Sequence, residues 1–176
     1  MNFIETKLKS AYIIDIKEIE DERGFFARGW CQDEFETHKL NPNIVQLNIG
    51  FNHKRGTVRG MHFQNTPKEE AKLVRCTKGA IYDVIIDLRR DSPTHGQWLG
   101  VELTEDNHRM LYVPEGFAHG YQTLVDRTEI YYQTSQFYAP ELASGVCFDD
   151  PAFGIRWPLP VEVISNQDRK WPLYSF

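Results

Sequence analysis

Cysteine is scarce in this chain of 176 residues, which contains three. Cys31, Cys76 and Cys147 are far apart in the sequence, odd in number and form no C-x-x-C pair. Such cysteines do not predict a disulfide framework, which is typical of small secreted domains. We therefore expect reduced thiols and a cytoplasmic protein.

Long apolar runs are also absent. No segment approaches the roughly 20 apolar residues that a membrane helix needs, and residues 1–24 are charged throughout, unlike a signal peptide. Basic residues are in the minority, with 20 Lys and Arg against 25 Asp and Glu and a formal net charge of −5. We expect neither a membrane partner nor general nucleic-acid binding, which usually needs a basic surface. A small anionic ligand stays open, because a few local arginines suffice to bind it.

The chain has enough apolar material for a substantial core, with 41% hydrophobic and 13% aromatic residues. Its length favours a single domain, residues 1–176. Short runs rich in β-branched and aromatic residues recur between turn residues, which predicts an all-β sandwich or closed barrel. The predicted strands cover residues 11–19, 24–30, 43–49, 57–64, 71–90, 97–104, 109–116, 120–124 and 128–138.

Three local features complete this pattern. Residues 31–40 predict a short helix that ends before Pro42. The sequence Thr-Lys-Gly at 77–79 predicts a hairpin turn within the run 71–90. Residues 150–176 are rich in Pro and Trp and lack periodicity, so we expect them to wrap over the barrel, with a frayed end as the alternative.

The stretch R-G-M-H-F-Q at residues 59–64 carries the strongest chemical signal. Arg59 and His62 are three apart on a predicted strand, so strict alternation would put them on opposite faces. Gly60 lies between them, and a bulge there would turn both side chains to the same side. A lone strand histidine is otherwise more often a core residue than a functional one.

A metal site is the first alternative for this histidine. His119, in P-E-G-F-A-H-G, could meet His62 in a jelly-roll barrel, as in the metal sites of cupins, which commonly use His-x-His, a Glu and a further His. Gln64 stands where the second histidine would be. Because a stable site usually needs three or more ligands, we predict no metal.

Several blocks in order resemble the dTDP-4-dehydrorhamnose 3,5-epimerase family nearly end to end. They are D-E-R-G-F-F, V-R-G-M-H-F-Q, the run from 71 to 103, V-P-E-G-F-A-H-G-Y-Q-T-L, Y-Y-Q-T-S-Q-F-Y and S-N-Q-D. The resemblance implies a cupin jelly-roll with a few short helices. It also implies a homodimer in which an N-terminal strand, here residues 11–19, joins the partner's sheet, and no cofactor, because proton transfer beside a ketone is redox-neutral.

The resemblance also assigns catalytic residues. His62 matches the base that removes a proton next to the 4-keto group, and Asp168 matches the carboxylate that orients it. Tyr132 matches the proton donor, and Lys72 the cation near the keto oxygen. Each has a structural alternative: Asp168 as a surface charge, Lys72 as a solvated strand residue, and Tyr132 as a barrel aromatic, with Tyr131 on the other face.

The remaining matches concern the nucleotide. Arg59 and Arg23 match arginines that contact the nucleotide, and Tyr138 and Phe26 match aromatics near the base. Four further positions match substrate contacts, namely Gln46, Asn48, Arg28 and His119. Arg28, Ala143 and Gln167 depart from the family, which usually has Glu, Glu and Lys there, so thymidine is only the default base.

The expected function is therefore inversion of C3 and C5 in a dTDP-linked 4-keto-6-deoxyhexose, a step of rhamnose-type deoxysugar biosynthesis. The alternatives are epimerisation of one carbon, a 3,4-ketoisomerase on the same scaffold, or a cupin that binds a sugar or a metal without turnover.

Overall fold

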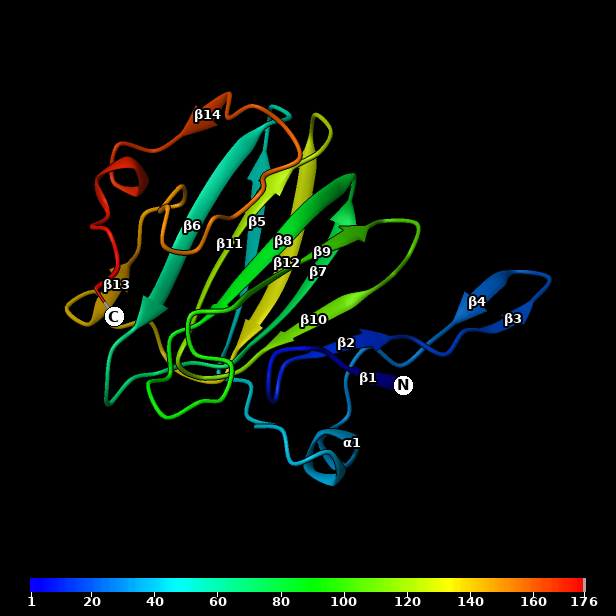
Figure 1. Ribbon diagram of the computed structural model, residues 1–176. Helices are drawn as coiled ribbons and strands as arrows, with labels where there is room; N and C mark the ends of the chain where they lie inside the picture. Colours follow the sequence, from blue (N-terminus) through cyan, green and yellow to red (C-terminus); the bar gives the residue numbers. More distant parts are fainter. Residues whose placement is uncertain (176) are drawn as a thin grey trace.

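Two antiparallel sheets form a sandwich in the computed structural model, which describes residues 1–175; Phe176, at the end of the predicted tail, lies outside the described residues. The first sheet has the order β1-β2-β10-β7-β12-β5, and the second has the order β13-β6-β11-β8-β9 with β14 beside β6 (Figure 1). The first sheet contains β1 (Asn2–Glu5), β2 (Tyr12–Asp15), β5 (Gln46–Asn52), β7 (Lys72–Lys78), β10 (Met110–Val113) and β12 (Thr128–Thr134). The second contains β6 (Thr57–Gln64), β8 (Ala80–Asp87), β9 (Trp98–Thr104), β11 (Phe117–Thr123), β13 (Ala143–Gly145) and β14 (Val163–Ile164). This all-β jelly-roll confirms the predicted fold class.

The core lies between the two sheets because alternate residues of each strand point inward. From the first sheet come Val74 and Leu111, and from the second come Ile81 and Ile85, all with no exposed surface. Replacing one of these leucine or isoleucine side chains by alanine would cost about 2–5 kcal/mol of stability. The core leaves one part of the space between the sheets unfilled, and that space is the cavity described below.

The turn at residues 77–79 is not a hairpin turn, so that prediction is wrong. Gly79 has a φ of +77° and ends β7, but β7 pairs with β10 and β12, whereas β8 pairs with β9 and β11. The chain therefore crosses from one sheet to the other at this corner. Turn chemistry is the same for a hairpin and for a corner, so the local sequence does not distinguish them.

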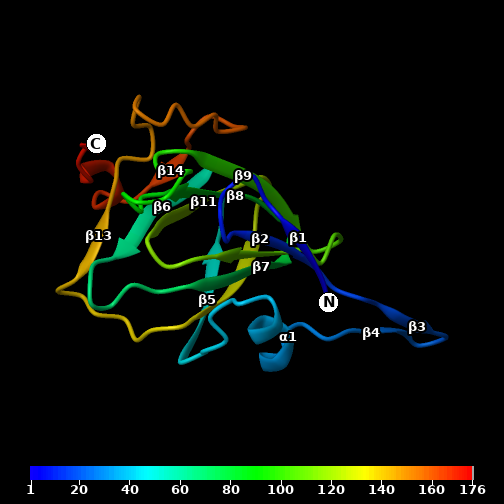
Figure 2. The same cartoon turned by 60° about the horizontal axis from the view of Figure 1, so that its bottom comes forward.

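The predicted strand 11–19 is broken, and it is not an exposed edge. Only β2 joins the first sheet, where it lies between β1 and β10 of the same chain. The chain continues into a separate hairpin, β3 (Ile19–Asp21) and β4 (Gly24–Phe26). This hairpin projects away from the sandwich in both views (Figures 1 and 2).

The short helix is confirmed as α1 (Gln32–Thr37). It lies against the outer face of the first sheet because Phe35 is buried there beside Leu40 and Tyr112. A 3₁₀ helix, η1 (Asp168–Lys170), is the other helical turn in the described chain. Within residues 1–175, no helix has both the length and the apolar character needed to cross a membrane.

The tail wraps over the second sheet, as predicted, and is held by hydrogen bonds as far as Tyr174. β14 pairs in parallel with the start of β6, and the Gln122 amide is hydrogen-bonded to both polar backbone atoms of Leu159. The Tyr174 N–H donates to an Asp150 carboxylate oxygen at 2.6 Å. These contacts fix η1, and with it Asp168, against β6.

Candidate active site

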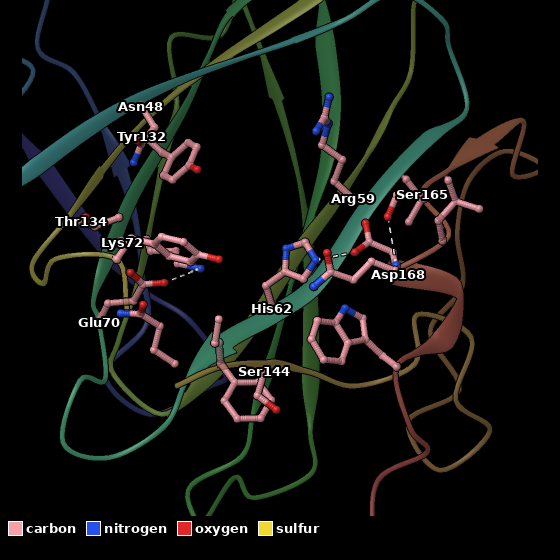
Figure 3. A pocket seen from close by; sticks show the side chains of 18 of the residues that line it. Asn48, Arg59, His62, Glu70, Lys72, Tyr132, Thr134, Ser144, Ser165 and Asp168 are labelled. Carbon is pink, nitrogen blue, oxygen red and sulfur yellow. Dashed lines mark hydrogen bonds and ion pairs between the residues drawn. The ribbon is translucent and has the colours of Figure 1, made fainter. Parts of the chain in front are cut away.

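A cavity of about 770 Å³ opens between the sheets, within the roughly 300–1,000 Å³ typical of ligand sites. One wall is formed by β5, β7 and β12 of the first sheet, and the opposite wall by β6 of the second. β13 and the tail from Val163 to Trp171 line its side. Figure 3 shows Tyr132, Lys72 and Glu70 on one side of this space and His62 with Asp168 on the other.

A bulge in β6 turns Arg59 and His62 into the cavity, as predicted. On β11, the residues that pair with them are Tyr121 and His119, which are two apart, so β6 contains one extra residue. Gly60 absorbs this residue with a φ of +136°, and a Cβ there would lie 2.5 Å from the Gly120 Cα. Glycine is therefore required both by the backbone conformation and by the close approach of β11.

His62 and Asp168 form a hydrogen-bonded pair. The His62 Nε2 is 2.7 Å from Asp168 Oδ1, and the carboxylate is buried whereas 43% of the His62 side chain is exposed. The backbone N–H of Gly60 donates to the other carboxylate oxygen at 3.4 Å. Burial acts to raise the pKa of Asp168, but the hydrogen bonds and the charge of His62 outweigh it and leave that pKa below its ordinary value. Asp168 is thus an anion that holds one ring nitrogen of His62.

The indole of Trp171 supports the same ring. Its ring centre is 6.3 Å from that of His62 at an angle of 71°, an edge-on contact. Gly145 of β13 pairs with His62 of β6, and a Cβ on Gly145 would lie 2.6 Å from the indole. The imidazole is therefore held by the carboxylate on one atom and by an aromatic ring beside it.

The opposite wall carries Tyr132 and Lys72 on one face. Tyr132 pairs with Val74 of the core and Thr134 pairs with Lys72, so Tyr132 and Lys72 are diagonal neighbours on the inner face. Tyr131 points outward instead, beside Arg75. This answers the question that alternation left open, and Tyr132 is the tyrosine that lines the cavity.

Burial and charge act together on this wall. Desolvation raises the pKa of Tyr132, the Glu70 carboxylate raises it further, and the Arg59 guanidinium lowers it less. The Lys72 ammonium is buried and lies 3.1 Å from Glu70 Oε1. The wall thus presents a protonated phenol and a fixed ammonium to the cavity.

Polar and aromatic side chains line the cavity along β5, from Gln46 to the residues around Arg59. Arg59 Nε donates to Asn52 at 2.9 Å, and Gln46, Asn48 and Tyr138 also line the cavity. Tyr138 is 64% exposed, so one ring face is free for stacking. Tyr138 lies by Gln46 at the start of β5, and Arg59 lies by Asn52 at its end, so the cavity offers an aromatic ring, amides and a guanidinium along this strand.

Gln64 braces the loop that carries this tyrosine. Its amide nitrogen donates to the Lys68 carbonyl at 2.8 Å and its oxygen accepts the Ala139 N–H at 2.7 Å. Gln64, which stands where a cupin metal site has its second histidine, therefore holds backbone atoms of this loop. Within residues 1–175, no group of three or more His, Cys, Asp or Glu side chains could hold a metal ion.

Four predicted contacts are not brought to the cavity of their own chain. Arg23 and Phe26 lie on the projecting β3–β4 hairpin, and Phe26 is 74% exposed. Arg28 Nη1 pairs with Glu34 at 3.2 Å near α1. His119 lies opposite His62 in register, but it is buried and its Nε2 is 2.7 Å from Asp83 Oδ1.

Other lining residues were not predicted as site residues from the sequence. Glu70 could have been found, because it lies two residues before Lys72 in an extended segment and therefore on the same side. Trp171, Ser144 and Ser165 gave no such signal, since they reach the cavity only through the packing of β13 and the tail.

Comparisons with known proteins identify the family of this chain. The family model for dTDP-4-dehydrorhamnose 3,5-epimerase matches residues 5–175. The chain is 42% identical to the dTDP-4-dehydrorhamnose 3,5-epimerase of Methanothermobacter thermautotrophicus over 172 residues, which cover 96% of this chain and 92% of the relative.

Two solved structures are also similar. The crystal structure of the enzyme of that name from Bacillus anthracis, with TDP and PPi bound, is 42% identical with a TM-score of 0.94, covering 98% of this chain and 99% of that one. The crystal structure of an epimerase from Legionella pneumophila, in complex with dTDP-4-keto-L-rhamnose, is 35% identical with a TM-score of 0.91, covering 98% and 92%. Because its sequence matches over nearly the full length and its fold matches as well, the chain belongs to the dTDP-4-dehydrorhamnose 3,5-epimerase family and is an isomerase.

Proposed function

We propose that the cavity binds a dTDP-linked 4-keto-6-deoxyhexose and inverts its C3 and C5 carbons, with His62 as the base and Tyr132 as the acid. The observation that carries this proposal is the position of His62 and Tyr132 on opposite walls of one cavity. A flat ring between the sheets, which pack about 10 Å apart, would have the base on one face and the donor on the other. Inversion requires this arrangement.

The reaction begins with removal of a weakly acidic proton. His62 takes the proton from a carbon next to the ketone, and the electron pair of the broken C–H bond moves to the keto oxygen as an enolate. Asp168 accepts a hydrogen bond from the imidazole and stabilises the imidazolium that forms, as the acid of a hydrolase triad does. The Lys72 ammonium stabilises the enolate oxygen. Tyr132 then protonates the same carbon from the other face.

The nucleotide is proposed to extend along the cavity between Arg59 and Tyr138, both of which line it. Its guanidinium suits a diphosphate, and the exposed ring of Tyr138 suits a stacked base. The Bacillus anthracis relative with TDP and PPi bound and the Legionella pneumophila relative with a dTDP-sugar bound support this assignment.

A dimer is part of the proposal. Arg23 and Phe26 extend away from their own cavity on the β3–β4 hairpin, so a second copy is where they could reach a substrate. The edge strand β5 also exposes apolar side chains, with Leu47 at 44% and Ile49 at 64%. Since β2 is paired within its own sheet, this hairpin is the segment that we propose to exchange. Light scattering tests this, and a mass near 20.6 kDa would contradict it.

A cytoplasmic location is also proposed. It is supported by the three free cysteines, one of which, Cys76, is buried, since reduced thiols are typical of that compartment.

Proton NMR in heavy water tests the reaction. With dTDP-4-keto-6-deoxyglucose, we expect deuterium to replace hydrogen at both C3 and C5 with formation of the inverted sugar. Exchange at only one carbon would instead support the single-carbon alternative. A matched substrate with another nucleotide tests thymidine, and no exchange with any member of the panel would refute the proposed function.

A further inference from the structure

Glu70 places a carboxylate in the wall that carries Tyr132 and Lys72. It lies in the backbone just before β7, two residues from Lys72, so both side chains lie on the inner side of the sheet. Its Oε1 is 3.1 Å from the Lys72 Nζ (Figure 3). Exposed fractions of 12% for Glu70 and 9% for the Lys72 side chain show that water screens this pair little.

The pair has a direct consequence for Lys72. An ammonium has three donors on a flexible stem, and holding it in one direction costs conformational entropy. A buried ammonium without a partner is also strongly disfavoured. Glu70 supplies the partner and leaves two N–H groups of Lys72 free for an oxygen in the cavity. The cation is therefore oriented before a substrate arrives.

The pair also acts on Tyr132 through space. The charged or titratable groups facing this phenol are Glu70 and Lys72 on its own wall, Tyr121 from β11, and, across the cavity, Arg59 and His62 from β6 with Asp168 from η1. Burial contributes most to the raised pKa of Tyr132, and the Glu70 charge adds to it against Arg59. Glu70 therefore disfavours a tyrosinate at this position.

We propose that Glu70 is a positioning residue for epimerisation: its carboxylate fixes the Lys72 ammonium at the enolate oxygen and its charge returns Tyr132 to the protonated form after each transfer. The inference rests on the proposed roles of Lys72 and Tyr132. In each transfer, the Tyr132 O–H bond breaks, the enolate electron pair forms the new C–H bond, and a tyrosinate is left. Two inversions use two protons, so the tyrosinate must take up a proton from water in between. The negative charge beside it drives that uptake.

The test compares Glu70→Gln and Glu70→Ala with Glu69→Gln as the matched control. Glu69 is the adjacent glutamate, does not line the cavity, and accepts a hydrogen bond from the Thr66 hydroxyl. The measurements are kcat and KM against pH, and ultraviolet titration of tyrosinate. Each titration is repeated in the Tyr132→Phe background, so that the difference isolates Tyr132.

We expect both Glu70 variants to move the alkaline limb of the kcat profile, and the titration of Tyr132, to lower pH. A neighbouring carboxylate opposes loss of a proton, so removing it makes that loss easier. Glu70→Ala should also lower kcat by about 10- to 100-fold at unchanged KM, as expected when a catalytic group is misplaced. Glu70→Gln should recover most of that loss, because its amide oxygen still accepts from Lys72. Glu69→Gln should match the wild type.

An unchanged Tyr132 titration in both Glu70 variants would overturn the inference, as would equal shifts in Glu69→Gln. If Glu70→Ala does not fold, the titration of Tyr132 in Glu70→Gln still tests the inference. The failure of the proposed function gives a different result: the wild-type protein would then show no exchange with any 4-keto sugar, whereas the titration would still report whether Glu70 acts on Tyr132.

Discussion

The two walls of the cavity are built in different ways. On the β6 wall, the proposed base is paired with a carboxylate 106 residues away in the sequence, delivered by the tail. On the β12 and β7 wall, Lys72 and Glu70 are two residues apart, and Tyr132 is placed by ordinary strand pairing. The first wall therefore depends on long-range packing of the tail, whereas the second depends on the central ladder of a sheet. Substitutions on the two walls should therefore impair different, measurable steps of the reaction.

Removing the base should have the largest effect. We expect His62→Ala to abolish exchange at both ring carbons and to lower kcat/KM by about 100- to 10,000-fold, the usual loss for a general base. Proton NMR in heavy water measures both quantities. The matched control is His38→Ala, just after α1 and outside the cavity, which should exchange normally. Wild-type exchange rates in folded His62→Ala would disprove the assignment.

Loss of the orienting carboxylate should cost less. Asp168→Asn keeps the shape but removes the charge, so we expect a loss near 100-fold, the lower end of the range for a general base. The pKa of Asp168 is lowered in the folded protein, so its ionisation stabilises the fold above about pH 4, the ordinary range of Asp, and that contribution is lost as the pH falls through the lowered pKa. Acid unfolding followed by circular dichroism should therefore be shallower in the variant. A steeper transition, or full activity, would argue against the pair.

A substitution on the Tyr132 wall should separate enolate formation from inversion, whereas loss of His62 stops both. Tyr132→Phe removes the donor but leaves His62, Lys72 and the ring volume, so we expect enolate formation to continue and inversion to fail. The observable is deuterium in recovered starting material with little inverted product. Tyr131→Phe, on the outer face of β12, is the control and should give product at the wild-type rate. Wild-type product formation by Tyr132→Phe would mean that another group is the donor.

Chelation should have the smallest effect. We expect full activity after treatment with a chelator, because Gln64 holds backbone atoms of the adjacent loop and His62 is engaged by Asp168. The measurement is kcat before and after dialysis against the chelator, with a divalent ion added back. Loss of activity that one ion restores would place a metal on this site and change the account of both walls.

The sequence predicts the local parts of this molecule better than the connections between them. Residues 57–64 are β6 with the predicted bounds, and Gly60 between Arg59 and His62 indicated the bulge, because backbone freedom is a local property. The corner at 77–79 was predicted wrongly, since the same turn residues serve within a sheet and between sheets. The approach of Asp168 to His62 came from family resemblance, because no periodicity links a tail residue to a strand. Tyr131 and Tyr132 could be separated only once the register of β12 with β7 was known.

The place of Asp168 in η1 has a consequence for the order of events during synthesis. A ribosome makes β6 and its imidazole early, and the carboxylate that orients that imidazole leaves the ribosome more than a hundred residues later. Contacts between residues so distant in sequence form slowly. A nascent chain would thus complete most of both sheets while its histidine still lacked an oriented tautomer, and catalysis would start as the tail docks on β6. A chain that ends just before position 168 should therefore still bind substrate but lack the carboxylate that orients His62.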